Sequence, residues 1–265
     1  MNWRVLHIAV LACVMLAGCE DDPCSPCGEC NCRYEARDDF RFAVPADGFP
    51  LFQVTGVNGE IEVTTQAMPD SVVIWGERRV ISNSSEADAE AHLSDLEVRV
   101  VKDAGGISAR TIQPTSADGR EYEVEYHALV PRAWETDVVN VNGNVSVSGS
   151  ENAVTVVLTN GQVVLEEIEG ETAVDLVNGQ VNAGVTLPPD GSCRISIVNG
   201  QIELTIPDDT SADLSASVTN GTVSVTGLTI TDLNTTPTSV TGMLGEGNGE
   251  IDLTAVNGTI WVGAN

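Results

Sequence analysis

The chain has 265 residues, with 12 Lys and Arg against 39 Asp and Glu, and its formal net charge at pH 7 is -27. A surface this acidic repels phosphate backbones, and nucleic-acid binding needs a stripe of Lys and Arg that the chain lacks, so DNA and RNA are excluded as partners. Hydrophobic residues make up 42% and aromatic residues 4%. This composition predicts a folded, aliphatic and β-branched core without the aromatic lining common in cofactor pockets, and we expect no cofactor.

Residues 1–18 are expected to form a signal peptide. Arg4 supplies a positive start, and the apolar run from Val5 to Ala17 is too short to span the ~30 Å of a bilayer as a helix. The run ends in Leu16-Ala17-Gly18-Cys19, which resembles the bacterial lipobox, whose Cys is diacylated and becomes the mature N-terminus. Lipidation of Cys19 would anchor the protein stably in a membrane. An ordinary secretory signal with a chance Cys is the alternative.

The residue after Cys19 bears on location. It is Glu20 rather than the Asp that resembles an inner-membrane retention signal. We therefore expect a protein anchored by lipid in the outer membrane, facing the periplasm or the cell surface.

Residues 19–40 are interpreted as an acidic, Cys-rich tether. The cluster of thiols comprises Cys24, Cys27, Cys30 and Cys32. An exported compartment oxidises thiols, so two local disulfides are expected; a metal or iron–sulfur site is the alternative, but the spacing departs from the usual pattern and we assign no metal. Cys193 has no His near it in sequence, which favours a small buried residue over a nucleophile.

An internal repeat organises residues 41–265. Asn-Gly recurs before segments in which apolar and polar residues alternate, such as VNGQIEL at 198, and Asn and Gly both tolerate tight chain reversals. The repeated pairs are Asn58-Gly59, Asn142-Gly143, Asn160-Gly161, Asn178-Gly179, Asn199-Gly200, Asn220-Gly221, Asn248-Gly249 and Asn257-Gly258.

Two all-β architectures satisfy this repeat. In the preferred one, each Asn-Gly is the corner of a coil in a parallel β-solenoid, and the Asn side chains form a ladder along its axis. In the alternative, each pair is the turn of an antiparallel hairpin, so that 195–198 folds back on 201–204. Stacked coils repeat each corner in register, whereas a meander does not need the same turn at every second reversal.

Residues 66–140 interrupt the repeat. Strands are expected at 71–75, 96–101 and 121–130, with one short helix over SSEADAEAHLSDLE, which begins with the N-cap candidates Ser84 and Ser85. The helix is expected to cover an open end of the solenoid.

The lipobox, the short helix, the strand ending in Val130-Pro131 and the Asn-Gly units together resemble the bacterial putative adhesins of the β-strand-repeat type, related to head GIN domain proteins. The resemblance covers about residues 41–265 and implies a single-stranded, right-handed parallel β-helix at the cell envelope. The Cys-rich tether is not a general feature of that family.

The sequence contains no metalloprotease, hydrolase, P-loop or EF-hand motif. His92 and His127 are interpreted as a chance pair. The acids at 166, 167, 169, 171, 208 and 209 fall at expected turns, which favours solvated corners over paired catalytic carboxylates or a Ca²⁺ site.

We therefore expect a non-enzymatic envelope protein that presents an extended binding surface to an unknown protein or carbohydrate. Two alternatives remain. The first is a structural or regulatory component that docks an envelope protein at the terminal strand 259–262, and the second is a polysaccharide-active enzyme.

Overall fold

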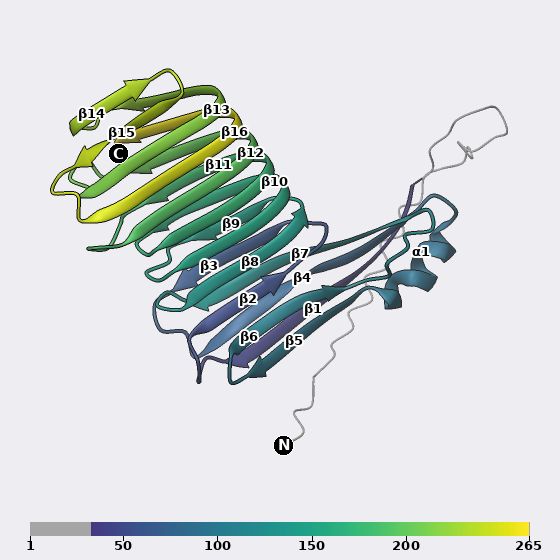
Figure 1. Ribbon diagram of the computed structural model, residues 1–265. Helices are drawn as coiled ribbons and strands as arrows, with labels where there is room; N and C mark the ends of the chain where they lie inside the picture. The colour runs from purple at the N-terminus through teal and green to yellow at the C-terminus, as the bar shows by residue number, and fades with distance from the viewer. Residues whose placement is uncertain (1–32, 265) are drawn as a thin grey trace, which may run out of the picture.

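The Asn-Gly units form the coils of a solenoid in the computed structural model, which describes residues 33–264 (Figure 1). The helical elements are α1 (Glu86–His92) and a 3-10 turn (Leu93–Asp95). The strands are β1 (Tyr34–Pro45), β2 (Leu51–Thr55), β3 (Ile61–Gln66), β4 (Ser71–Ser82), β5 (Glu97–Asp103), β6 (Gly106–Ile112), β7 (Arg120–Pro131), β8 (Glu135–Asn142), β9 (Val145–Ser148), β10 (Val154–Ile168), β11 (Thr172–Val185), β12 (Ser192–Ile206), β13 (Ala212–Thr226), β14 (Ile230–Thr236), β15 (Ser239–Leu244) and β16 (Gly249–Ala264).

The coils pair in parallel, and their registers place each Asn-Gly beside another. Asn178 lies between Asn160 and Asn199, and the pairing continues through the glycines on both sides. β12 runs without a break through Asn199-Gly200, and both of its halves pair with neighbouring coils rather than with each other. The solenoid is therefore confirmed, and the antiparallel hairpin alternative is wrong.

Each long strand curves around one edge of the solenoid at its Asn-Gly corner (Figure 1). The halves before the corners form one sheet surface, which we call the first face; it also contains β2, β5, β6, β8, β14 and β15. The halves after the corners form the second face, which also contains β1, β3, β4, β7 and β9. In β10, Val156 and Leu158 before the corner and Val163 and Leu165 after it are all buried in one hydrophobic core. Alternate residues of both faces therefore point outward.

The corners form a column of asparagine and glycine. Each Asn side chain donates to the next at 2.7–2.9 Å, in the order Asn220, Asn257, Asn199, Asn178, Asn160, Asn142 and Asn58. At Gly200, φ is +142°, and a Cβ would lie 1.7 Å from the carbonyl oxygen of Gly179. Only glycine allows the backbones of successive corners to approach so closely.

Asn248-Gly249 differs from the other pairs and takes no part in this column. Gly249 starts β16 opposite Ala212, and its N–H donates to the carbonyl oxygen of Ser211 at 3.0 Å. Our assignment of this pair as a repeat corner is therefore wrong, because β16 takes its corner from Asn257-Gly258.

The C-terminal strand is inserted between two earlier coils. The spatial order is β12, β16, β13, so Thr259–Val262 pairs with Gln201–Leu204 on one side and with Thr222–Val225 on the other. The alternative in which a partner docks at strand 259–262 is therefore wrong in its choice of edge, because this strand is paired on both sides. Beyond β13, the antiparallel strands β15 and β14 extend the first face only.

The twelve-residue strands β1, β4 and β7 pair antiparallel and project from the solenoid as an arm (Figure 1). The helix α1 contacts β1 and β4, so it lies on the arm and not, as expected, over a solenoid end. The predicted tether boundary at residue 40 is also wrong, because β1 begins at Tyr34.

A carboxylate fastens the helix to the arm. Asp88 accepts hydrogen bonds from Arg120 of β7 at 2.7 and 2.8 Å and from Ser82 of β4 at 2.7 Å. The guanidinium of Arg120, followed by the hydroxyl of Ser82, lowers the pKa of Asp88 to about 2.

We expect Gly200→Ala to lower the free energy of unfolding by about 3 kcal/mol or more, because the new methyl group meets a backbone carbonyl that cannot move. Gly184→Ala in β11 is the control, since its Cβ would lie 3.7 Å from the nearest atom, the carbonyl oxygen of Leu165. Urea unfolding of both variants tests this. Equal destabilisation would refute a special role for the corner.

Replacing Asp88 with Asn should lower the melting temperature at pH 7. Because the pKa of Asp88 is lowered in the folded chain, its stabilisation is complete above the unfolded value near 3.8 and is lost as pH falls through about 2. The melting temperatures of the wild type and of Asp88→Asn should therefore converge as the pH falls from about 3.8 to about 2. A difference that persists unchanged below pH 2 would contradict the assignment.

Candidate binding surface

The residues predicted for lipidation and for disulfides, Cys19 and the cluster from Cys24 to Cys32, lie outside the described part of the chain. Cys193 is described and is buried in β12 between Thr172 and Ile251. Burial raises the pKa of its thiol to about 12, so the thiolate required of a nucleophile is disfavoured.

One cross-strand row of outward-facing residues crosses the whole second face. None of its members is buried, and each is registered against the next. In spatial order they are Arg41, Trp75, His127, Glu62, Ser146, Val164, Asn182, Glu203, Trp261 and Ser224. We call this set the second-face row. It connects the arm to the last coil.

The arm end of this row holds a cluster of aromatic and charged side chains. The guanidinium carbon of Arg41 lies 5.8 Å from the ring centroid of Trp75, and the Trp75 ring stacks on His127 at 5.5 Å with an interplanar angle of 18°. On its other side, His127 Nδ1 lies 2.8 Å from Glu62 Oε2. This arm cluster keeps an indole ring half-exposed on a flat sheet, an arrangement suited to contact with a partner.

A shallow depression of about 380 Å³ lies further along the second face. Gly184 leaves the gap, and Glu166, Glu167 and Glu203 border it with exposed carboxylates. Asn182 also borders it, and its Oδ1 accepts from Gln180 Nε2 at 2.9 Å. The site is an open trough rather than a cleft.

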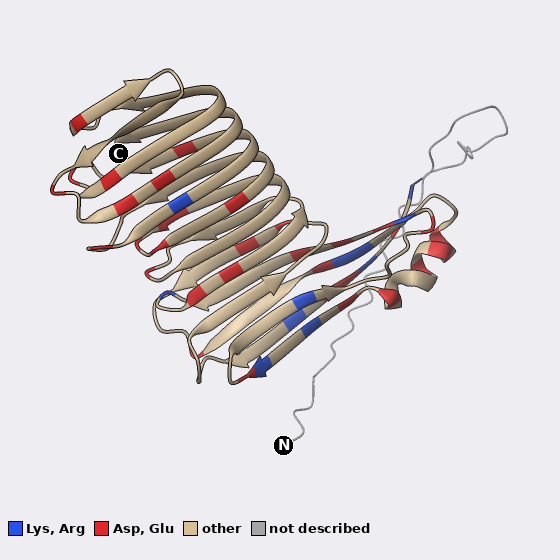
Figure 2. Ribbon diagram, in the orientation of Figure 1, with Lys and Arg blue, Asp and Glu red and all other residues tan. Residues whose placement is uncertain are grey.

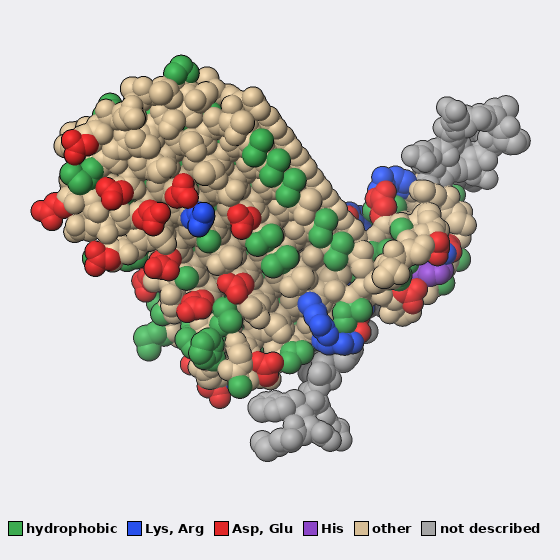
Figure 3. Space-filling view, in the orientation of Figure 1, with side chains coloured by type: hydrophobic (Ala, Val, Ile, Leu, Met, Phe, Trp, Pro, Cys, Tyr) green, Lys and Arg blue, Asp and Glu red, His purple; other side chains and the backbone are tan. Residues whose placement is uncertain are grey.

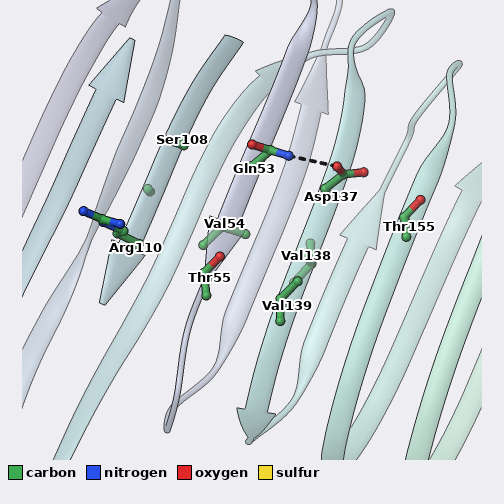
Figure 4. Close-up of a pocket in the computed structure, with 10 residues that line it drawn as sticks. Gln53, Val54, Thr55, Ser108, Arg110, Asp137, Val138, Val139 and Thr155 are labelled. Carbon is green, nitrogen blue, oxygen red and sulfur yellow. Dashed lines mark hydrogen bonds between the residues drawn. The ribbon is translucent and has the colours of Figure 1, made fainter. Parts of the chain in front are cut away.

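The first face carries a smaller depression of about 220 Å³ across β6, β2 and β8 (Figure 4). Gln53 Nε2 donates to Asp137 Oδ2 at 3.1 Å at one end, while Arg110 and Thr55 lie along the other (Figure 4). Between these polar ends most of the lining is apolar, with contributions from Val54, Val138 and Val139.

An apolar stripe follows the first face beside the asparagine column. Val141, Val177, Val198 and Val256 each precede an Asn-Gly corner, and each is 39–43% exposed. Sequence reasoning missed this stripe, although the recurring letters VNG were its signal.

Charge is distributed unevenly along the molecule. Between residues 133 and 264 the sequence has 17 Asp and Glu but one basic residue, Arg194. Figures 2 and 3 show acidic residues over the coils and most basic residues toward the arm and the strands beside it. The coils therefore attract cations and repel anions.

A family model described as Toastrack DUF4097 matches residues 44–263. The chain belongs to the Toastrack DUF4097 family. This match confirms the predicted resemblance to β-strand-repeat proteins. No curated protein sequence matches this chain.

Solved structures similar to this Toastrack chain have low sequence identity. A putative cell adhesion protein from Clostridium sporogenes has 12% identity and a TM-score of 0.47, covering 87% of this chain and 100% of that one. A putative adhesin from Bacteroides fragilis has 10% identity and a TM-score of 0.33, and the match covers 87% of this chain and 97% of that one. A putative lipid binding protein from Parabacteroides distasonis has 9% identity and a TM-score of 0.30, and the match covers 86% of this chain and 96% of that one.

The other acidic and histidine residues considered as candidates do not come together into a site. Glu169 and Glu171 do not border the trough, and His92 ends α1, where Nδ1 lies 2.8 Å from the carbonyl oxygen of Asp88. Within residues 33–264, no three His, Cys, Asp or Glu side chains gather to hold a metal ion. No helix in this range is long and apolar enough to cross a membrane.

Proposed function

We propose that this Toastrack protein is anchored to the outer membrane through a lipid on Cys19 and binds a partner at the cell envelope through the outer faces of its solenoid, without catalysing a reaction. The observation that carries the proposal is the second-face row, with the exposed arm cluster at one end. Aromatic and Arg side chains presented together are typical anchors of protein interfaces.

The arm indicates how the anchored protein would be oriented relative to the membrane. β1 begins at the end of the arm, where Tyr34 pairs with Ser82 close to α1 (Figure 1). Residues 20–33 would link that point to Cys19 and could reach at most ~50 Å when extended. The arm then lies toward the membrane, and the last coils point away from it.

The trough supports binding better than glycoside hydrolysis. Its three carboxylates are exposed on the outside of a sheet, whereas glycosidases place two carboxyl groups on opposite sides of a bound sugar ring in environments that differ. A flat, acidic and polar surface is suited to a protein or carbohydrate partner that is basic or neutral.

Replacing Cys19 with Ser should move the protein from the membrane fraction to the soluble exported fraction. In cells fed an alkyne-tagged fatty acid, the tag should label the wild-type chain and not the variant. Cys24→Ser is the matched control and should behave as wild type. Equal labelling of all three chains would reject Cys19 as the anchor.

Trp75→Ala should reduce attachment of the cells to surfaces or to one another, measured in a deletion strain that carries the variant at wild-type abundance. We expect a loss of at least about fivefold if the arm cluster is an interface anchor contributing ~1 kcal/mol or more. Leu233→Ala is the control, because Leu233 is 53% exposed but lies outside the row. Equal attachment with both variants would count against the proposal.

A further inference from the structure

Several strands within residues 33–264 have an edge without a strand partner, and most of these edges are protected. β1 and β5 carry charges of both signs, and the first half of β7 carries Glu121, Glu123 and Glu125. β14 contains an irregularity at Asp232, whose φ is +52°. Charges and bulges are the usual means by which proteins prevent another chain from pairing with a free edge.

The second half of β13, residues Thr222–Thr226, lacks this protection. β16 pairs with it on one side, while β15 pairs only with the first half of β13 on the other. Its sequence is Thr-Val-Ser-Val-Thr, and the chain carries no charged residue from 214 to 231. This segment, which we call the β13 edge, contains neither a proline nor a bulge.

A backbone donor and a side-chain acceptor remain available there. The N–H of Val223 donates to the carbonyl oxygen of Pro237 at 3.1 Å, and the N–H of Val225 points to the same side, where no strand lies in the described chain. Asn220 is the last member of the asparagine ladder: it donates to Asn257, and among residues 33–264 no Asn donates to its Oδ1. The ladder thus ends in an acceptor that an added chain can use.

The hydrophobic core is also incompletely covered at the β13 edge. Ile260 and Val262 of β16 are 1% and 0% exposed, whereas the residues registered against them, Val223 and Val225, are only half-buried. One more strand on the second face would cover these valines and use the free backbone groups. The same edge lies in the coils that the proposed anchor directs away from the membrane.

We propose that the β13 edge binds an extended segment of another protein, which adds to the second face as a further strand. The segment that fits has β-branched side chains at alternate positions and basic residues at its ends, because the edge is uncharged and the surrounding coils are strongly acidic. A second copy of this chain fits less well, because two acidic coil ends repel each other. This inference rests on the proposed function and identifies the surface that the partner uses.

The probe is a fluorescein-labelled peptide, KKTVTVTVTKK, and its binding to the full-length chain in detergent is measured by fluorescence polarisation. Ser224→Lys should weaken binding at least tenfold, because it places a charge at the edge and repels the basic ends. Ser215→Lys is the matched control: Ser215 is exposed on the same strand but outside the second-face row, and its half of β13 is paired with β15 and β16 on its two sides. This control should bind as wild type.

Val225→Pro provides a second measurement. It removes the free N–H without breaking a hydrogen bond of the folded chain, since proline is tolerated where the strand N–H faces solvent. The variant should remain folded, with a melting temperature lowered only by the lost packing of the half-buried Val225 side chain, and should lose peptide binding at least fivefold.

Equal peptide affinity for the Ser224→Lys and Ser215→Lys chains would overturn the inference. So would a wild-type dimer, seen by light scattering, that Ser224→Lys converts to a monomer, because the occupant would then be a second copy. If cells carrying Ser224→Lys keep full attachment while those carrying Trp75→Ala lose it, the β13 edge is rejected and the proposed function stands.

Discussion

Backbone contact between glycines at the corners is the constraint on which the architecture depends. The space beside each corner carbonyl is too small for a Cβ, and the neighbouring amide side chains can then bond in one continuous line. Together these two features fix the register of every coil against the next. A shift by one residue would break the amide line and turn the buried aliphatic side chains outward.

Because the register is fixed, outward-facing residues of different coils are aligned with one another even though their sequences vary. Positions that point into the core stay aliphatic from coil to coil, while the outward positions differ freely. The outward residues at one distance from the corner form a straight row across strands that are far apart in the chain. The second-face row arises in this way, and the arm strands extend it beyond the coils because β7 pairs with both β3 and β4.

The recurrence of Asn-Gly predicted the alternating core and favoured parallel coils with an amide ladder over antiparallel hairpins. It could not predict the position of β16, because every coil carries the same corner and would satisfy the ladder in any stacking order. The helix was placed wrongly because its position depends on an arm whose strand lengths no repeat encodes. The arm cluster joins residues 41, 62, 75 and 127, and only long-range pairing brings these four together.

The insertion of β16 has a consequence for the order of folding. Coils up to β12 can stack in the order of the sequence, but β13 obtains its parallel neighbour only from β16, which follows it after β14 and β15. β12 and β13 therefore acquire their shared neighbour only when β16 has folded between them, and a chain truncated before β16 exposes two coils that have lost that neighbour.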